Sequence, residues 1–241
     1  MRTISSVSRA ALALLTIATG LYAKAYDKSI DIAGVTLHYK VVLPKDYDAS
    51  KPYPAVLAFP PGSQGADMVM TTLVRNWQPE AERRGYIVFI PSAPNGRLFY
   101  EEGASVFPEF LDKMLAEYKI RDNKFHIAGM SNGGISAFYI AAAYPQYFWS
   151  VTGFPGYLPD PTPARVNALA KLCINMHVGE YDSGWVRQMQ DQAAQFRAKG
   201  FSVRFTIEKG ENHVLGTLQG PGAVRLFDQI EEARQGCGKQ G

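Results

Sequence analysis

The pattern of hydrophobic and polar positions divides the chain into two parts. Between residues 29 and 43, polar and apolar residues alternate around Gly34, which predicts a hairpin or two edge strands. After residue 54, the apolar residues form short unbroken runs, at 55–59, 86–90, 125–128, 150–154, 173–178 and 202–207. Such runs are typical of strands that are buried on both faces of a parallel sheet.

Segments of helical length separate these runs, and apolar residues recur in them at the spacing of a helix. We expect helices at 66–84, 106–118, 132–143, 183–199 and 222–232. Pro108 falls in the first turn of the second helix, where proline is tolerated, and Gly200 suits the C-terminal cap of the fourth. The alternation of strand and helix predicts an α/β fold with a mostly parallel central sheet and helices on both faces.

The first residues have a different character. Arg2 and Arg9 precede an apolar stretch at 10–21, and residues 23–25 are Ala-Lys-Ala, the small-x-small form of a cleavage site. This pattern predicts a signal peptide at residues 1–25 and a single secreted or periplasmic domain at 26–241. The apolar stretch is short for a membrane span, and an uncleaved anchoring segment is the alternative interpretation.

The charge balance and the cysteine content further limit the functions and the cross-links that the chain can have. The chain has 25 Lys and Arg against 22 Asp and Glu, and no run of like charge indicates a nucleic-acid surface. Its two cysteines, Cys173 and Cys237, fit no zinc or redox spacing. In an oxidising compartment we expect them to form a disulfide that holds the Gly-rich tail, and two unrelated thiols are the alternative.

One motif carries candidate chemistry, the Gly-Met-Ser-Asn-Gly-Gly sequence at 129–134. It fits G-x-S-x-G, and it lies between an expected strand and an expected helix, as a nucleophile elbow requires. The turn is tight, so small residues are needed two positions before and after Ser131. We therefore predict Ser131 as a nucleophile, and an ordinary turn with a serine N-cap is the alternative.

A serine nucleophile needs a base, and the chain has four histidines. His38, His126 and His177 fall inside expected strands, which favours structural roles. His213 instead follows the last expected strand, at the carboxyl ends of the strands, where open α/β sheets have their binding sites. We predict His213 as the base, with His177 as the rival.

The base in turn needs an orienting acid. Asp182 follows the expected strand at 173–178 and is the predicted partner, giving the chain order Ser131, Asp182, His213 that a nucleophile elbow leads us to expect. Glu180 and Asp160 are rival acids. Asp182 could alternatively cap the helix that begins near residue 183.

An oxyanion hole completes the expected machinery. One donor should be the backbone N–H of Asn132, the residue after the nucleophile, and the other should come from the loop at 60–65. The prolines at 60 and 61 have no N–H, so we expect Ser63 to donate, with Gly62 or Gln64 as alternatives. A loop that only reverses the chain direction is the simpler interpretation.

At these residues the sequence resembles the α/β-hydrolases, over nearly all of the chain from residue 29 onward. It is most similar to the small secreted esterases grouped with polyhydroxybutyrate depolymerases and feruloyl esterases. The resemblance depends on the loop at 60–64, the elbow at 129–134, the segment at 179–182 and His213. Many members have His-Gly where this chain has Pro61-Gly62, and this departure removes a side chain that often braces the loop.

The resemblance implies hydrolysis of esters through an acyl-enzyme, on aryl, short-chain or polyester-type substrates, without a metal or organic cofactor. A serine peptidase of the same fold and a non-catalytic binding protein are the alternatives. The short segment at 155–172 leaves little room for a lid, so we expect an open cleft. Three aromatic residues beside the catalytic loops could line it or be ordinary packing residues: Phe154, Tyr157 and Trp185.

Overall fold

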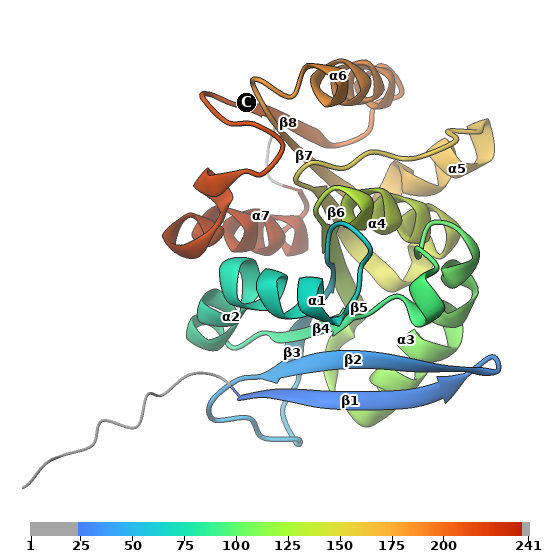
Figure 1. The fold of residues 1–241 in the computed structure, drawn as a ribbon, viewed down its shortest axis with the longest axis vertical. Helices are drawn as coiled ribbons and strands as arrows, with labels where there is room; N and C mark the ends of the chain where they lie inside the picture. The colour runs from blue at the N-terminus through green and yellow to red at the C-terminus, as the bar shows by residue number, and fades with distance from the viewer. Residues whose placement is uncertain (1–23, 238–241) are drawn as a thin grey trace, which may run out of the picture.

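The computed structural model describes residues 24–237, which form an eight-stranded sheet with the order β1-β2-β4-β3-β5-β6-β7-β8 (Figure 1). The β1–β2 and β2–β4 pairs are antiparallel, and every later pair is parallel. The predicted hairpin and the predicted parallel sheet are therefore both confirmed. The strands are β1 (Lys24–Ile32), β2 (Val35–Leu43), β3 (Tyr53–Phe59), β4 (Ile87–Pro91), β5 (Ile120–Gly129), β6 (Phe148–Gly153), β7 (Cys173–Gly179) and β8 (Val203–Glu208).

Helices cover both faces of the sheet (Figure 1). Apolar side chains of α3, α4, α5 and α6 belong to one buried cluster, and those of α1, α2 and α7 belong to a second cluster on the other face. This arrangement explains why the parallel strands are apolar on both sides. The helices are α1 (Ala66–Thr72), α2 (Gln78–Arg84), α3 (Phe107–Glu117), α4 (Asn132–Ala143), α5 (Pro163–Ala168), α6 (Ser183–Ala198) and α7 (Val224–Arg234).

The segment predicted as one helix at 66–84 contains a π turn at Leu73–Trp77, between α1 and α2. Trp77 at its end is fully buried and packs against Phe154 and Phe227, with ring centroids 6.1 and 5.7 Å apart. The sequence pattern did not predict this irregularity, because α-helical and π-helical turns bury similar residues.

The sequence pattern also missed helix α5. It is short, and its start is set by local chemistry: the Thr162 side chain accepts the N–H of Arg165 at 3.4 Å, and Pro163 occupies the first helical position. Together with the 3-10 turn Leu169–Lys171, α5 occupies the short connection from β6 to β7.

The predicted disulfide is present. Cys173 at the start of β7 is joined to Cys237, with their Cα atoms 5.3 Å apart. The bond fixes the end of the described chain, just after α7, to the sheet.

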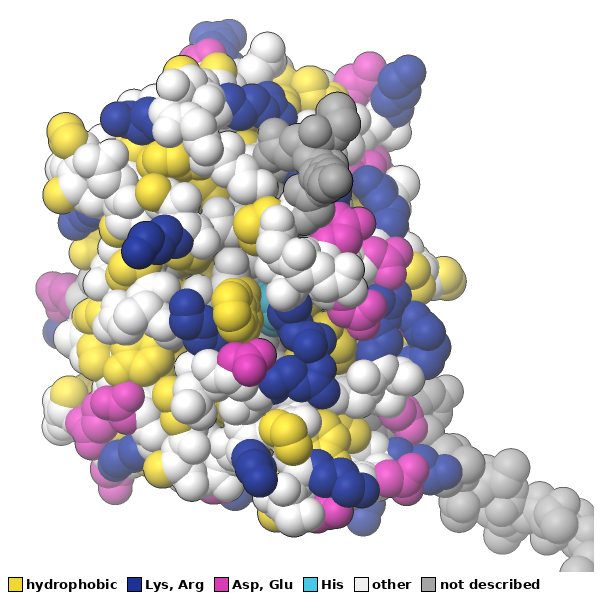
Figure 2. Space-filling model, turned by 180° about the vertical axis from the view of Figure 1, so that it is seen from behind, with side chains coloured by type: hydrophobic (Ala, Val, Ile, Leu, Met, Phe, Trp, Pro, Cys, Tyr) yellow, Lys and Arg dark blue, Asp and Glu magenta, His cyan; other side chains and the backbone are white. Residues whose placement is uncertain are grey.

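Most of the predicted signal peptide lies outside the described residues. Its last two residues, Lys24 and Ala25, open β1 and pair with Leu43 and Val42. Within residues 24–237, no helix has the length and apolar character needed to cross a bilayer. On the face seen in Figure 2, basic and acidic side chains are intermixed and form no extended patch of one sign.

Candidate active site

Ser131 lies at a sharp turn between the end of β5 and the start of α4. Its backbone has a positive φ of 56°, which is unfavourable for a residue with a side chain. The N–H of Ser131 donates to the carbonyl oxygen of Pro155 at 2.8 Å, which helps to hold this conformation. A serine in a strained backbone conformation, between the end of a strand and the N-terminus of a helix, is the arrangement that defines a nucleophile elbow.

The glycines around Ser131 are required by close backbone contacts. A Cβ at Gly129 would lie 2.1 Å from the carbonyl oxygen of Gly133, and a Cβ at Gly133 would lie 2.3 Å from that of Phe59. Gly134 is equally constrained, because its Cβ would lie 2.2 Å from the carbonyl oxygen of Pro155. These contacts are far shorter than van der Waals separation, so a side chain at 129, 133 or 134 would displace the neighbouring backbone.

Three predicted residues from three loops form one chain of hydrogen bonds. His213 Nε2 lies 2.8 Å from Ser131 Oγ, and His213 Nδ1 lies 2.6 Å from Asp182 Oδ2. With the proton on Nδ1, the imidazole donates to Asp182 and accepts the hydroxyl proton of Ser131. The His213 side chain is 38% exposed and that of Asp182 is 15% exposed, so the imidazole is the more accessible of the two groups.

The rival residues are engaged elsewhere. The Glu180 carboxylate accepts the N–H of Gly210 at 2.9 Å, and Asp160 pairs with Arg165 at 2.7 Å. The Asp182 side chain makes no capping hydrogen bond at the start of α6, in contrast to the capping alternative.

His177, the rival base, is fully buried, with Nδ1 3.0 Å from Glu208 Oε1 and Nε2 2.9 Å from Gln229 Oε1. Glu208 also receives two hydrogen bonds from Arg225, at 2.8 and 3.0 Å. The bond from His177, followed by those from Arg225, lowers the pKa of Glu208 to about 2. This hydrogen-bonded network lies at the end of β8 and supports the start of the loop that carries His213.

The loops that carry Asp182 and His213 are tied directly to one another. The N–H of Tyr181 donates to the carbonyl oxygen of Glu211 at 3.0 Å, and a Cβ at Gly179 would lie 2.0 Å from the carbonyl oxygen of Asn212. Together with the bond from Gly210 to Glu180, these contacts set the distance between acid and base. This role of Glu180 is not visible in the sequence, which does not show that the Gly210 N–H lies within hydrogen-bond distance of the Glu180 carboxylate.

His126 has an unusual environment among the structural histidines. Its Nδ1 lies 2.8 Å from Ser150 Oγ, whereas its buried Nε2 has no hydrogen-bond partner. The ring is 1% exposed, and burial lowers the pKa of His126 to about 3. His126 is therefore a buried structural histidine with a hydrogen bond at only one of its two ring nitrogens.

The loop after β3 lies against the elbow, and one of its predicted donors is already engaged. The N–H of Gln64 donates to the carbonyl oxygen of Pro61 at 3.0 Å. The fully buried Gln64 side chain donates to Ser136 Oγ at 3.0 Å and accepts the N–H of Phe99 at 3.0 Å. Gln64 therefore braces the loop from inside, and Gly62 and Ser63 remain as the exposed residues beside the elbow.

Asn132 connects this loop to the elbow. Its side-chain Nδ2 donates to the carbonyl oxygen of Gly62 at 2.8 Å. Its backbone N–H lies in the first turn of α4, where helix N–H groups have no acceptor within the helix. The braces supplied by Gln64 and Asn132 were not predicted, because nothing in the sequence indicates which distant segments the two amides contact.

Of the three predicted aromatic residues, Trp185 lies beside His213 and Tyr157 packs against Trp185. The Trp185 ring is 5.0 Å from the His213 ring in an edge-on arrangement, and Tyr157 lies 5.0 Å from Trp185. Both are partly buried. Phe154 corrects the expectation: it is 1% exposed and packs against Trp77 on the far side of the sheet, so it is a core residue and does not line a cleft.

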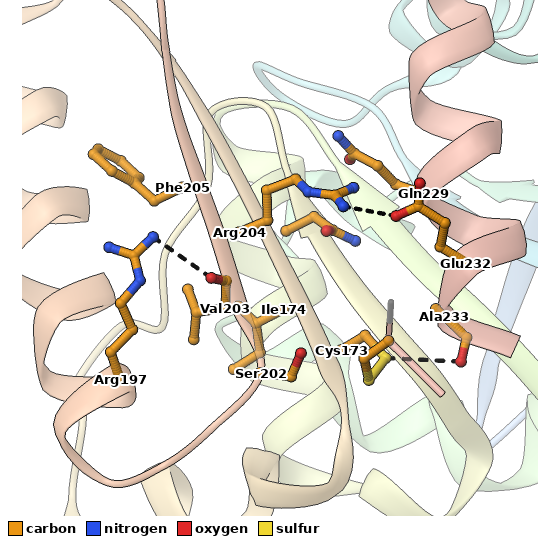
Figure 3. Close-up of a pocket in the computed structure, with 12 residues that line it drawn as sticks. Cys173, Ile174, Arg197, Ser202, Val203, Arg204, Phe205, Gln229, Glu232 and Ala233 are labelled. Atoms are coloured by element: carbon orange, nitrogen blue, oxygen red, sulfur yellow. Dashed lines mark hydrogen bonds and ion pairs between the residues drawn. A yellow bond between two sulfur atoms is a disulfide. The ribbon is translucent and has the colours of Figure 1, made fainter. Parts of the chain in front are cut away.

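A pocket of about 340 Å³ lies far from these loops, at the start of β7 and β8 (Figure 3). The disulfide cysteines line part of it. Of its two arginines, Arg204 pairs with Glu232 at 2.6 Å and Arg197 donates to the carbonyl oxygen of Val203 at 3.5 Å. Its charged groups are thus already used within the protein. Among residues 24–237, no cluster of three or more His, Cys, Asp or Glu could hold a metal ion.

No protein-family model and no curated protein sequence matches this chain. Solved structures do match it. A thermostable esterase superposes with a TM-score of 0.69 at 19% identity, over 88% of this chain and 62% of that one. A dipeptidyl aminopeptidase IV, described as putative, from Bacteroides ovatus gives 0.64 at 15% identity, over 90% and 36%. The feruloyl esterase module from Clostridium thermocellum gives 0.61 at 14% identity, over 80% and 83%.

The chain therefore spans less than two thirds of the length of the first two matching structures. These identities are low, so the likeness defines the fold and no more. With the sheet order and the strand-to-helix elbow, it establishes that this protein has the α/β-hydrolase fold. The resemblance to the α/β-hydrolases that the sequence predicted is therefore confirmed for the fold.

Proposed function

We propose that this protein is a secreted serine carboxylic-ester hydrolase. The observation that supports this most is the hydrogen-bonded chain from Ser131 through His213 to Asp182, at a strained elbow in an α/β-hydrolase fold. Neighbouring structures with the same fold are named as esterases and hydrolases, which favours ester substrates. The predicted signal peptide and the disulfide support export from the cytoplasm.

The proposed reaction proceeds in two halves. As Ser131 Oγ bonds to the ester carbonyl carbon, His213 Nε2 takes the hydroxyl proton, and the carbonyl electron pair moves onto its oxygen. The N–H groups of Asn132 and Ser63 stabilise this oxyanion, and Asp182 orients the imidazolium. The C–O bond to the alcohol then breaks, and His213 gives its proton to the departing oxygen.

Water completes the cycle by the same route. His213 accepts a proton from water as the water oxygen attacks the acyl-enzyme carbonyl, and it returns that proton to Ser131 Oγ as the acid departs. Losing one oxyanion donor typically costs about 3–4 kcal/mol of transition-state stabilisation. No step requires a metal or an organic cofactor.

The substrate class follows from the surroundings of His213. Trp185 lies beside the imidazole and Tyr157 packs against Trp185, so that the two partly exposed rings form an aromatic edge, and planar aryl groups pack well against such an edge. The feruloyl esterase module from Clostridium thermocellum was crystallised with sinapinate. We therefore place aryl esters first, ahead of short-chain and polyester-type esters.

The decisive experiment compares the purified protein without residues 1–25 with its Ser131→Ala variant. The substrates are p-nitrophenyl acetate, butyrate and octanoate together with methyl ferulate. We expect turnover that is lost in the variant, and turnover that persists in Ser131→Ala would refute the assignment of the nucleophile.

A serine peptidase remains the second candidate, because the dipeptidyl aminopeptidase from Bacteroides ovatus shares the fold. Dipeptide p-nitroanilides in the same assay separate the two activities. Cleavage of these amides with no turnover of any ester would favour the peptidase. Absence of both activities, with the fold intact, would favour a binding protein.

A further inference from the structure

The Asn132 side chain makes a contact that the proposed mechanism does not use. Its Nδ2 donates to the carbonyl oxygen of Gly62 at 2.8 Å, between positions 70 residues apart in the chain. The contact joins the first turn of α4 to the loop after β3, the two segments that supply the proposed oxyanion donors. The inference below rests on the proposed ester hydrolase function.

The carbonyl of Gly62 and the N–H of Ser63 belong to the same peptide unit. In a trans peptide these two groups point in opposite directions from one rigid plane, and the only cis peptide among residues 24–237 is Phe154–Pro155. A hydrogen bond that fixes the direction of the Gly62 carbonyl therefore also fixes the direction of the Ser63 N–H.

This peptide unit is the centre of a tight turn, which the hydrogen bond from the Gln64 N–H to the Pro61 carbonyl closes. Gly62 and Ser63 are exposed, and Gly62 has a positive φ of 62°, in a region where glycine moves freely. The neighbouring position is held firmly instead, since Gln64 is buried and bonded through its N–H, carbonyl and side chain. Asn132 thus adds a direct hydrogen bond to the exposed central peptide of this turn.

A carbonyl that accepts a hydrogen bond also makes the N–H of its own peptide a better donor, because the two dipoles polarise one another. We propose that the Asn132 side chain is a positioning residue of the oxyanion hole, which holds the Gly62–Ser63 peptide so that the Ser63 N–H faces the developing oxyanion. Asn132 then contributes to the oxyanion hole in two ways. Its own backbone N–H is one donor, and its side-chain amide orients the other donor, the Ser63 N–H.

Two variants test this proposal while keeping the backbone N–H of residue 132. Asn132→Ala removes the amide. Asn132→Asp preserves the shape but replaces the donor with a carboxylate that repels the Gly62 carbonyl, and an acid is well tolerated in the first turn of a helix. Asn167→Ala, at an exposed position on α5, is the matched control.

With p-nitrophenyl acetate, we expect kcat to fall about 10- to 100-fold in both variants, less than for complete loss of an oxyanion donor. KM should stay within about twofold of the wild-type value, because the substrate carbonyl in the ground state interacts only weakly with these donors. The inhibition constant of phenylboronic acid, which forms a tetrahedral adduct with a serine nucleophile, should rise in parallel with the loss of kcat/KM. The control should match the wild type.

Unchanged kcat in folded Asn132→Ala would overturn the proposal, as would a rise in KM alone. Thermal unfolding accompanies each measurement, and failure of both variants to fold would assign the contact to stability and equally refute the positioning role. The proposed function fails separately: in that case the wild-type protein itself shows no turnover that depends on Ser131.

Discussion

Gly134 and Pro155 approach so closely that the carbonyl oxygen of Pro155 occupies the place where a side chain at 134 would begin. The same oxygen accepts the N–H of Ser131. Gly134→Ala should therefore displace the group that holds the serine in its strained conformation. We expect ester turnover to fall at least 10-fold and the free energy of unfolding to fall by about 1–3 kcal/mol.

Steady-state kinetics and urea unfolding measure the two effects of Gly134→Ala. Gly184→Ala is the control, since nothing lies within 4 Å of a Cβ built at Gly184, near the start of α6. Full activity in Gly134→Ala would mean that the Pro155 carbonyl can move without consequence for Ser131.

Substitutions of Asp182 and Glu180 should have clearly different effects on kcat. Asp182→Asn leaves the shape intact but removes the charge that orients His213, and we expect kcat to fall by about 10³- to 10⁴-fold. Glu180→Ala removes only the acceptor for the Gly210 N–H, at a cost of about 1 kcal/mol or about fivefold in rate. Comparable losses in the two variants would return Glu180 to consideration as the acid.

Trp185 and Tyr157 should affect aryl substrates more than small ones. In Trp185→Ala, we expect kcat/KM for methyl ferulate to fall about 10-fold more than kcat/KM for methyl butyrate, which has no aromatic ring, because aromatic contacts contribute about 1 kcal/mol beyond burial. Phe154→Leu, in the core, should lower stability without changing this ratio. A uniform loss on both substrates would indicate that Trp185 only supports His213.

His126 predicts a dependence of stability on pH. Burial lowers its pKa from 6.5 to about 3, so below pH 6.5 the unfolded chain binds a proton that the folded protein excludes. The stabilisation from the neutral ring is complete above pH 6.5 and is lost progressively as the pH falls toward 3. Between pH 6.5 and pH 5 this single group should remove about 2 kcal/mol from the free energy of unfolding.

Urea unfolding at several pH values measures this slope. His126→Gln should be less sensitive to pH in that range, whereas His38→Gln, on the exposed side of β2, should keep the wild-type slope. Equal slopes in the wild type and His126→Gln would contradict the prediction.

The bond between Cys173 and Cys237 closes a loop with a sequence separation of 64 residues. By the chain-entropy argument, Cys237→Ser should lower the free energy of unfolding by about 4 kcal/mol. Ester turnover at 25 °C should be unchanged in the folded variant, because the bond lies at the opposite edge of the sheet from Ser131. A large loss of kcat would show that the bond also shapes the active-site loops.

Sequence alone predicted those features that depend on local pattern. The strands followed from apolar runs, and Ser131, Asp182 and His213 were singled out because each follows a strand at its carboxyl end. The structure brings these three side chains into hydrogen-bond contact.

Features that depend on contacts between distant segments could not be predicted in this way. The insertion of Gln64 between Ser136 and Phe99, the bond from Asn132 to Gly62 and the burial of Phe154 against Trp77 each join parts of the chain far apart in sequence. Aromatic character alone does not tell a core residue from a cleft residue, so the sequence could not show that Phe154 is buried in the core.

The π turn at Leu73–Trp77 has a consequence for how chain length can vary. A π turn holds one residue more than an α-helical turn, so the helices on either side keep their buried faces when that residue is removed. Deleting the exposed Val74 should convert the segment into a regular helix. Deleting one residue inside α4 would instead rotate the rest of that helix by about 100° relative to the part before the deletion. Alignments of homologous sequences should therefore contain a one-residue gap at 73–77 and none in α4.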